Sequence, residues 1–502
     1  MQTRRDQLQA YRYLVRRVLA AMLGSDPEAI EQPMRRVTTS TFAGIMVGAV
    51  ACAGVALYAW LADSNSSKWK NEAASALIVE KETGALYVYR DKSLLDPTTS
   101  NQPPQVPGQG SDKNMLLMPI RNATSAMLLM GAGMTKVSVG RDSLAGIPRG
   151  PEIGIAKAPN AVPVKESLVS APWAMCATAH VIDEETTPEV DLLIGTKEGT
   201  VGGRTVGERG LLVQGPDKRY YLVWHGKRLA TEPRALASID LSASSAIQVS
   251  EEWLRALPAG QDLAGPTVEG RKNPGPVTLD DGTGTTIGEV FHVSDPDRFY
   301  LMNHDGFAEI TEVQARILLG TGVAFSDGQP QTSRTEVGLS TVLAHLSADH
   351  DGDLRVADLP AKTPALVSLP SRDTPLCLWY DNNPAGDKAQ QHLTTGGTLP
   401  PSVDIDAGRG ARPRIVVPPG GGALAALLPA PGVAPSGFYL ITESGEKFPV
   451  PNKETLALLG YDGVDPLPVP PPLLNLIPTG PALSSQAASH ADQLTAASTT
   501  GN

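Results

Sequence analysis

The most regular hydrophobic pattern in the chain is one uncharged run near its N-terminus. Residues 42–62 read FAGIMVGAVACAGVALYAWLA, which is 21 positions without a charged side chain. A helix of that length rises roughly 31 Å, about the thickness of the hydrocarbon core of a bilayer. The run from Phe42 to Ala62 is therefore predicted to be a transmembrane helix.

Two other interpretations of this run fit it less well. A buried core helix rarely lacks every charge over such a length. A signal peptide has a shorter apolar stretch with an Ala-x-Ala-like cleavage site directly after it, whereas the first full match here is Ala74-Ser75-Ala76. We therefore expect the segment to remain as a single-pass anchor.

A helical pattern of period 3.6 lies ahead of the anchor. Its apolar positions share one face, and Arg12, Arg16 and Arg17 lie away from that face. The apolar positions are Leu8, Tyr11, Val15, Val18, Leu19 and Met22. Such an amphipathic helix packs on a partner protein, which we favour, lies on the inner leaflet with its arginines facing anionic lipid, or remains a solvated tail. The pattern alone leaves all three open.

Charge around the anchor sets the expected orientation. Seven arginines precede the run, and Lys68, Lys70 and Lys81 follow it. Counts close to the run are nearly even, but the positive-inside rule applies to whole short loops, and a long following domain is translocated largely regardless of its charge. Residues 1–41 are therefore predicted to be cytoplasmic, with about 440 residues exported beyond the membrane.

Similar segments recur in the exported part. The three clearest copies are RYYLVWHGKRLATEPRALASI from Arg219, RFYLMNHDGFAEITEVQARILLG from Arg298 and GFYLITESGEKFPVPNKETLALLG from Gly437. Each combines an aromatic-rich strand pattern, a glycine turn, a second strand and a helix pattern. A weaker early copy, ALIVEKETGALYVY from Ala76, gives strand, turn at Gly84 and strand. The sequence therefore predicts an elongated α+β domain of β-hairpin and helix repeats.

The repeats agree in finer detail. LRALPAGQDL from Leu254 resembles LNLIPTGPAL from Leu474, which extends the likeness beyond the helix. Thr311, with a glutamine three residues later, predicts a capping box, and Asn452 is a candidate cap for the last copy. Gly320 and Gly460 are the expected helix stops.

These patterns divide the chain into ten parts. They are residues 1–41, an Arg-rich amphipathic helix; 42–62, the membrane helix; 63–97, the start of the exported domain with the first repeat; 98–113, a Pro/Gln-rich connector; 114–200, a central core segment; 201–275, the second repeat; 276–345, the third repeat; 346–436, a further core segment with a Pro/Gly-rich connector; 437–484, the fourth repeat; and 485–502, a disordered tail.

The cysteines fit an exported protein. Cys176 and Cys377 are isolated, with neither a CxxC motif nor histidine at metal-ligand spacing. A far-separated pair in an oxidising compartment predicts one disulfide, and two unpaired buried thiols are the alternative. Trp173 and Trp379 suggest that the bridge is buried among aromatic side chains at the centre of the domain, whereas Cys52 is expected to be a small apolar residue of the membrane helix.

The charge balance of the chain bears on whether nucleic acid is a partner. The formal net charge is −11, and residues 1–41 hold seven arginines against four acidic groups, so the remainder is more acidic still. An acidic bulk argues against nucleic acid as a partner. The 49 glycines and 43 prolines favour short strands and turns over long helices.

Motifs for catalysis or metal binding are missing from the sequence. No GxxxxGK[ST] phosphate loop, GxSxG or HExxH is present. Asp349, Asp351 and Asp353 alternate like the start of a calcium loop, but Leu354 stands where that loop needs glycine and Pro360 where it needs glutamate. We therefore predict no catalytic, cofactor-binding or metal-binding residue.

The ordered features resemble the EccB family, a core membrane component of type VII (ESX) secretion systems. The motifs that carry the resemblance are Thr3-Arg4-Arg5-Asp6-Gln7, TGALYV at 83–88, PRGPEIGI at 148–155, WAMC ending at Cys176, LCLWY around Cys377 and IPTGPALS at 477–484. They occur in the family's order over nearly the whole chain.

The resemblance implies a structural role in a secretion complex of the inner membrane. It implies partners of the EccC, EccD and EccE types, the mycosin protease as a neighbour in the periplasm, and assembly as a homodimer or larger oligomer. Family members are often catalogued as ATPases, so ATP enters as a possible cofactor by that label only. The alternatives are therefore an ATPase subunit of the same system and a module that binds the cell wall.

Overall fold

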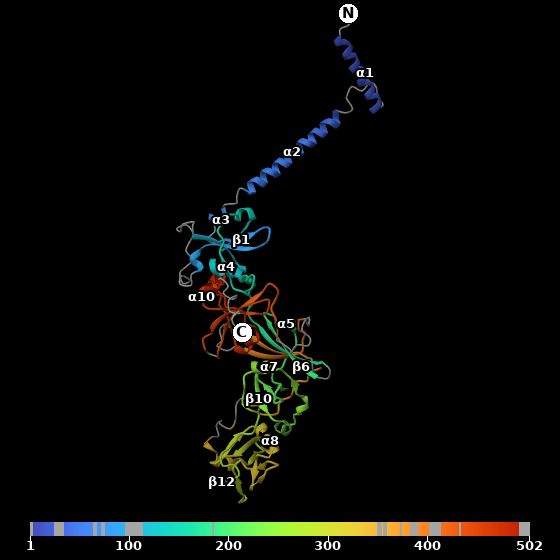
Figure 1. The fold of residues 1–502 in the computed structure, drawn as a ribbon. Helices are drawn as coiled ribbons and strands as arrows, with labels where there is room; N and C mark the ends of the chain where they lie inside the picture. Colours follow the sequence, from blue (N-terminus) through green and yellow to red (C-terminus); the bar gives the residue numbers. More distant parts are fainter. Residues whose placement is uncertain are drawn as a thin grey trace, which may run out of the picture. The chain divides into compact units, whose positions relative to one another are not determined.

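The computed structural model describes most of the chain. The described residues are 4–24, 35–63, 68–71, 76–95, 114–182, 185–348, 354, 359–371, 374–381, 390–400, 413–430 and 433–490. By contacts the chain divides into two compact units (Figure 1). One comprises Met1–Lys92, Val106–Met118 and Thr135–Gly150, and the other Ser93–Gln105, Pro119–Met134 and Pro151–Asn502.

The N-terminal region is helical. Helix α1 spans Arg4–Gly24, α2 spans Arg35–Asp63, and the short α3 spans Lys68–Asn71. Within α2, Thr39–Tyr58 has a mean hydropathy of 1.9 and no buried residue, so it is long and apolar enough to cross a bilayer. This confirms the predicted candidate membrane helix, which continues at both ends past the apolar run.

The first unit contains a four-stranded sheet. Its strands are β1 (Ala76–Glu80), β2 (Leu86–Asp91), β3 (Met115–Pro119) and β4 (Thr135–Val139), in the spatial order β3-β2-β1-β4. Strand β4 runs parallel to β1, and β2 antiparallel to it. Trp69, Ile78 and Leu117 pack in its core. Two 3-10 turns, η1 (Lys92–Leu95) and η3 (Arg141–Leu144), adjoin the strands.

The same topology recurs three times in the second unit. In every copy three antiparallel strands are followed by a helix, and a fourth strand returns parallel to the first. The second repeat holds β8 (Leu211–Gln214), β9 (Tyr220–Trp224), β10 (Lys227–Thr231), α6 (Pro233–Ser238), β11 (Ile247–Gln248) and α7 (Glu251–Ala256). The third holds β14 (Val290–Val293), β15 (Arg298–Met302), β16 (Phe307–Ile310), α8 (Glu312–Thr321), β19 (Thr335–Glu336) and α9 (Leu339–Ala344). The fourth holds β23 (Gly422–Leu427), β24 (Ser436–Thr442), β25 (Lys447–Val450), α10 (Lys453–Leu458), β26 (Leu467–Val469) and α11 (Pro471–Leu476).

In the three clear copies, the sequence pattern predicted the second and third strands and the helix, but not the first and fourth strands. The hairpins expected in the three clear copies are the second and third strands, β9-β10, β15-β16 and β24-β25. The early copy differs, because the turn at Gly84 joins the first and second strands of its sheet. Residues 98–113 therefore fall between its second and third strands rather than after the repeat, although they lie outside the described residues. Strands β3 and β4, which we had assigned to the central core, complete this first sheet.

The end of each repeat is tied back to its third strand. Four equivalent parallel bridges do this: Leu117 with Arg149, Arg228 with Ala259, Phe307 with Leu346, and Lys447 with Thr479. Two of them lie in the segments LRALPAGQDL and LNLIPTGPAL, so the likeness between those segments is a shared structural feature.

The helix caps agree with the sequence except at one glycine. Thr311 forms the capping box of α8, and Asn452 accepts a hydrogen bond from the Thr455 amide at the start of α10. However, α8 ends at Gly322, which adopts the left-handed conformation, so Gly320 lies inside the helix. A methyl group at Gly320 would overlap Ser238 of α6, which indicates that this glycine lets α6 and α8 approach.

A six-stranded sheet forms the centre of the second unit. Its strands, in spatial order, are β22 (Arg414–Val416), β6 (Glu185–Ile194), β5 (Trp173–Ile182), β20 (Leu376–Asp381), β21 (Gln390–Thr395) and β7 (Arg204–Thr205). The remaining elements are α4 (Ala123–Met130), η4 (Lys165–Ser167), α5 (Glu198–Val201), η5 (Ala243–Ser245), the pair β12 (Pro274–Thr278) and β13 (Gly284–Thr286), and the pair β17 (Phe325–Ser326) and β18 (Gln329–Pro330).

One hydrophobic cluster joins the central sheet to two repeats. It contains Trp173 and Leu378 of the central sheet, Trp253 of the second repeat, and Ile441 and Leu473 of the fourth. A second cluster joins the second repeat to helix α8 of the third. The second and fourth repeats therefore share a core with the central sheet, and the third repeat packs on the second through a separate cluster.

The tail begins later than the sequence suggested. Residues Ser485–Ser489, which we had placed in the disordered tail, form the short helix α12. The Ser484 hydroxyl accepts a hydrogen bond from the Ala487 amide, and the Ser485 hydroxyl donates to the Leu128 carbonyl of α4. Small polar residues therefore anchor this helix by capping and side-chain contacts. The rest of the predicted tail, from residue 491, lies outside the described residues.

The packing at Gly480 gives a test of the fourth repeat. A methyl group there would overlap the buried Phe448 ring of β25, whereas one at Gly284 would meet open space. Overpacking of this kind costs about 1–3 kcal/mol. Gly480→Ala is therefore expected to lower the apparent Tm of the detergent-solubilised chain by several degrees, and Gly284→Ala to leave it unchanged. Equal Tm values for the two variants would contradict this packing.

Candidate functional site

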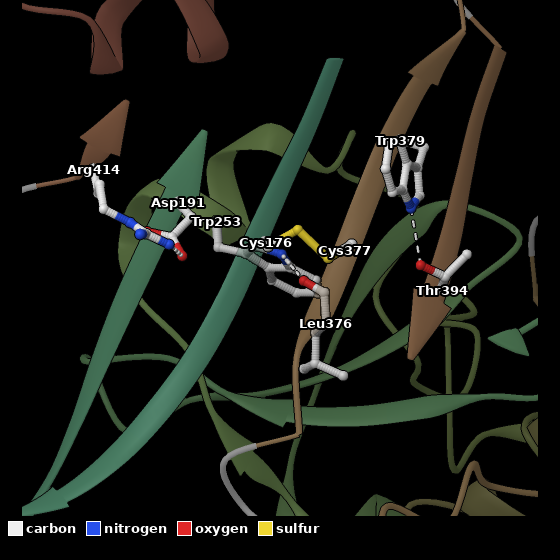
Figure 2. Close-up of a disulfide and its surroundings, with 8 residues drawn as sticks. All are labelled: Cys176, Asp191, Trp253, Leu376, Cys377, Trp379, Thr394 and Arg414. Carbon is white, nitrogen blue, oxygen red and sulfur yellow. Dashed lines mark hydrogen bonds and ion pairs between the residues drawn. A yellow bond between two sulfur atoms is a disulfide. The ribbon is translucent and has the colours of Figure 1, made fainter. Parts of the chain in front are cut away.

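The disulfide lies at the middle of the central sheet. Cys176 of β5 and Cys377 of β20 are directly opposite each other in the antiparallel ladder, and their sulfurs are bonded (Figure 2). Their Cα atoms are 4.0 Å apart, and both side chains are fully buried. The predicted pairing is confirmed, and it joins positions separated by 201 residues.

The tryptophans predicted to surround this bridge lie on opposite faces of the sheet. Trp379 is two residues from Cys377 and packs in the same cluster as the disulfide. Trp173 is three residues from Cys176 and packs in the cluster on the other face. Side chains alternate between faces along a strand, so the odd spacing directs Trp173 away. The expectation that both flank the bridge was therefore wrong for Trp173.

Buried and partly buried polar contacts connect the elements around the disulfide. The Trp379 indole donates to the Thr394 hydroxyl at 2.9 Å, and the Trp253 indole donates to the Leu376 carbonyl at 3.2 Å. Arg414 of β22 donates two hydrogen bonds to Asp191 of β6, at 2.7 and 2.6 Å. Such a bidentate charge-assisted pair fixes geometry as well as adding stability. Figure 2 shows these residues around the disulfide.

Helix α1 presents the predicted apolar face to solvent. The six side chains of this face are exposed, with exposed fractions between 39% and 81%. They are Leu8, Tyr11, Val15, Val18, Leu19 and Met22. Arg12, Arg16 and Arg17 are exposed as well. The structure thus brings these residues onto one continuous helix.

Helix α2 carries the two residues that bound the predicted span. Phe42 is 68% exposed, and Ala62 lies in the last turn of the helix. Cys52 is also exposed and unpaired, as expected of a residue in the membrane helix.

Metal-ligating side chains do not gather into a site in the part of the chain that the structure describes. Among them, no group of three or more histidine, cysteine, aspartate or glutamate side chains could hold a metal ion. The residues of the proposed calcium-like run, Asp349, Asp351 and Asp353, lie outside the described part of the chain. A cavity of about 240 Å³ is lined by Leu211, Leu212, Ile247, Leu366 and Val367 with Ser245 and Ser368. It has no titratable group to activate a substrate.

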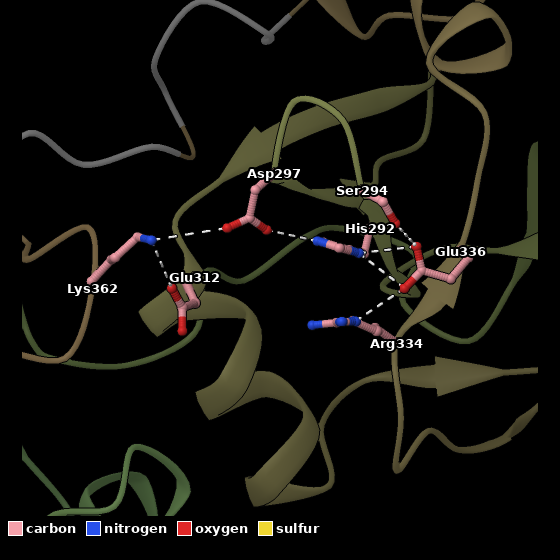
Figure 3. A network of polar contacts seen from close by, with 7 residues as sticks. All are labelled: His292, Ser294, Asp297, Glu312, Arg334, Glu336 and Lys362. Carbon is pink, nitrogen blue, oxygen red and sulfur yellow. Dashed lines mark hydrogen bonds and ion pairs between the residues drawn. The ribbon is translucent and has the colours of Figure 1, made fainter.

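Sequence reasoning missed a set of histidines paired with carboxylates. His292 lies between Asp297 and Glu336 (Figure 3), and His392 between Glu198 and Asp381. No sequence motif links these residues, because Glu336 and Glu198 lie 44 and 194 positions away from their histidines. A prediction of which strands pair, and at which positions, would be needed to find these contacts.

One protein-family model matches nearly the whole chain. The family model described as "Type VII secretion system ESX-1, transport TM domain B" matches residues 1–496. A relative named ESX-1 secretion system ATPase EccB1, from Mycolicibacterium smegmatis (strain MKD8), is 26% identical over 499 residues, which covers 97% of this chain and 94% of that protein. ESX-2 secretion system ATPase EccB2, from Mycobacterium tuberculosis (strain ATCC 25618 / H37Rv), is 28% identical over 440 residues, covering 82% and 81%.

Solved structures share the fold. A chain in the intact ESX-5 inner membrane complex matches with a TM-score of 0.63 at 24% identity, covering 97% of this chain and 95% of that one. A chain of the EccB3 dimer from the ESX-3 core complex matches with a TM-score of 0.60 at 21% identity, covering 82% and 99%. The arrangement of repeats around a central sheet is therefore a shared architecture.

The disulfide gives a test of the central sheet. Replacing both cysteines, Cys176→Ala with Cys377→Ala, is expected to destabilise the folded state by about 2–5 kcal/mol, because the unfolded chain regains the freedom of a long loop. The readout is the apparent Tm of the detergent-solubilised chain, with Cys52→Ala as the control that should change nothing. Free thiols at both positions, found by non-reducing mass spectrometry of protein from the oxidising side, would contradict the pairing.

Proposed function

Because the chain belongs to the EccB family of type VII secretion systems, we propose that it is a structural core component of an ESX inner-membrane complex. The observation that carries this proposal is the family match, which runs from residue 1 to 496 and so includes α1, the membrane helix and all four repeats. The exported repeats mediate oligomerisation and assembly, and α2 fixes them to the membrane. This role needs surfaces and rigidity rather than a catalytic centre.

The proposed orientation puts the N-terminus in the cytoplasm and the repeats in the periplasm. The arginines ahead of α2 support this, since positive charge is retained on the cytoplasmic side. The disulfide supports it independently, because disulfides persist in oxidising compartments and are rare in the cytosol. A related solved chain belongs to a periplasmic assembly of the ESX-5 complex.

The proposed partners differ on the two sides of the membrane. On the cytoplasmic side, the exposed apolar face of α1 packs on membrane components of the EccC, EccD or EccE types. On the periplasmic side, the repeats contact a second copy of the chain and the mycosin protease. Related chains occur in a multi-subunit inner-membrane complex and in an EccB3 dimer, which supports both kinds of contact.

An ATPase subunit is the second candidate function, since several relatives carry that word in their names. A phosphate loop needs a lysine followed by serine or threonine to hold the phosphates and Mg²⁺. The glycine-rich segments GTKEGTVGG from Gly195 and PPGGG from Pro418 lack that pair. The residues therefore favour the structural role, and ATP remains a cofactor by label only. A cell-wall-binding module, the third candidate, would not need α1.

Reporter fusions on either side of helix α2 test the proposed orientation. Alkaline phosphatase is active only after export, so a fusion after Gln214, behind strand β8, is expected to be active, and a fusion at Gly24, behind α1, to be inactive. Matched expression of the two fusions, measured by immunoblot, is the control. An active fusion at Gly24 with an inactive fusion at Gln214 would reverse the proposed orientation.

Substitutions on the apolar face of helix α1 test the proposed contact with the other membrane components. Val15→Glu with Val18→Glu places two charges on the apolar face and is expected to reduce co-purification of the other membrane components at least about tenfold, because burying an unpaired carboxylate is costly. Gln9→Glu with Ala10→Glu adds the same charge elsewhere on α1 and should leave co-purification intact. The measurement is quantitative mass spectrometry after mild-detergent purification of the tagged chain. Equal loss with both double variants would show that charge alone matters and would remove the assigned contact face.

A further inference from the structure

The first repeat follows the membrane helix after a very short connection. Helix α2 ends at Asp63, the first charged residue after the apolar run, and α3 begins at Lys68. A chain spans at most about 3.6 Å per residue, so the Cα atoms of these two residues lie no more than about 18 Å apart. The headgroup layer is about 5–8 Å thick, and charges act over about a further 8 Å at physiological salt. Helix α3 therefore begins within reach of the lipid headgroups.

Trp69 fixes α3 to the sheet of the first repeat. Its side chain is only 2% exposed and packs with Ile78 and Leu144 in the core of that sheet. Its ring meets Tyr89 edge-on, with 5.5 Å between the ring centroids. Tryptophans next to a membrane span are usually found among the headgroups, whereas this one is buried in protein. The sheet must therefore stay beside α3, and so close to the membrane.

Two segments cover the side of the sheet on which Trp69 lies. Alternate residues of β2 and β4 point into the cluster around Trp69. Helix α3 packs there through Trp69, and residues 141–149 pack there through Leu144 and Ile147. We call the exposed side chains of α3 and of residues 141–149 the basic face.

Two exposed cations of the basic face lie over aromatic rings. The Lys70 Nζ lies 5.7 Å from the centroid of the Trp69 ring, and the Arg149 guanidinium carbon lies 5.0 Å from the centroid of Tyr87. An aromatic ring attracts a cation through its quadrupole but carries no net charge. These contacts therefore orient both side chains without neutralising them.

The acidic groups near this face gather at its 3-10 turn, η3. Arg141 pairs with the nearly buried Glu80 at 2.9 Å, and its backbone amide donates to Glu82 at 3.1 Å. Asp142 is the only acidic residue within the two segments themselves. The turn is therefore close to neutral or acidic, and the net positive charge of the face comes from α3 and Arg149.

The charge of the chain changes sharply beyond the first repeat. Residues 42–150 hold ten basic and eight acidic side chains, whereas residues 151–502 hold 25 and 41. An anionic surface therefore repels the later part of the chain but not the part that follows α2 directly. Reach and charge together select the membrane surface as the partner of the basic face.

We propose that the basic face of the first repeat docks on the anionic lipid headgroups of the leaflet from which α2 emerges, with Lys70 and Arg149 contacting lipid phosphate. The first repeat then has two attachments to the membrane, the covalent one through α2 and the electrostatic one through this face. The two together set the orientation of the first repeat on the bilayer. The proposal requires α2 to be a membrane helix, holds for either orientation of the chain, and does not depend on the role in secretion.

Quenching by lipid headgroups tests this docking in the full-length chain. A fluorophore is placed on the exposed residue after η3 by Ala145→Cys, in a Cys52→Ala background. The chain is reconstituted into phosphatidylcholine vesicles with or without phosphatidylglycerol, each holding the same fraction of a lipid with a spin-labelled headgroup in both leaflets. Quenching is expected to be strong with phosphatidylglycerol and weak without it. About 1 M salt shortens the Debye length to about 3 Å and should abolish the difference.

A second label position and vesicle flotation serve as controls. A label at the exposed Thr332 of the third repeat, introduced by Thr332→Cys, should remain unquenched in both kinds of vesicle because its surroundings belong to the acidic part of the chain. Flotation with both kinds of vesicle shows that α2 anchors the chain whatever the lipid charge. Equal quenching at Ala145→Cys with and without phosphatidylglycerol would overturn the proposal, and so would equal quenching at the two label positions.

Matched charge reversals identify the contacting side chains. Lys70→Glu with Arg149→Glu is expected to lower the ratio of docked to undocked first repeat at least about tenfold, because each basic residue near an anionic leaflet strengthens the contact about fivefold. Lys81→Glu with Lys136→Glu makes the same change in charge away from the basic face: Lys136 alternates along β4 with Val137 and Val139, which point into the cluster. This control pair should dock like the wild type. Equal losses with the two pairs, at unchanged Tm, would show that total charge rather than the basic face governs docking and would refute the assignment.

Discussion

The pairing of β5 with β20 is the constraint on which the rest of the exported fold depends. These strands come from segments about 200 positions apart, and the disulfide between Cys176 and Cys377 fixes their register. One face of the sheet they build forms a common core with the second and fourth repeats, and the other face buries the disulfide with Trp379. In the chain-entropy model, closing so long a loop restricts the unfolded chain by roughly 5 kcal/mol. The bridge therefore stabilises a contact whose loop closure carries a large entropic cost.

The repeats explain why such a centre is needed. Their fourth strands have two or three residues in the second, third and fourth copies, and most of their helices have six. Units this small cannot bury a sufficient core alone, so each relies on its neighbours. The second repeat packs on the central sheet and also on helix α8 of the third repeat. The third repeat is therefore held in place through the second. A domain built in this way holds interaction surfaces at fixed positions, as a scaffold requires.

The sequence predicted the features that depend on local pattern. The uncharged run, the three hairpins with their helices and the capping box at Thr311 follow from periodicity and turn chemistry, and the cysteine pair followed from its isolation. Features that depend on long-range register were missed. Two-residue strands such as β19 are too short to show alternation, and Trp173 was misplaced because strand parity was not applied to it. The approach of α6 to Gly320 and the contact of Glu336 with His292 involve residues far apart in the sequence, so local reasoning could not identify them.

We propose that this member of the EccB family acts through assembly rather than through chemistry of its own. Its described residues form surfaces, a disulfide-linked core and a membrane-capable helix, and its sequence lacks a phosphate loop. The most direct test is ATP turnover by the homogeneous full-length chain in detergent with Mg²⁺. The structural account predicts no release of phosphate above a protein-free control. Sustained turnover that disappears on a single substitution in this chain would contradict it.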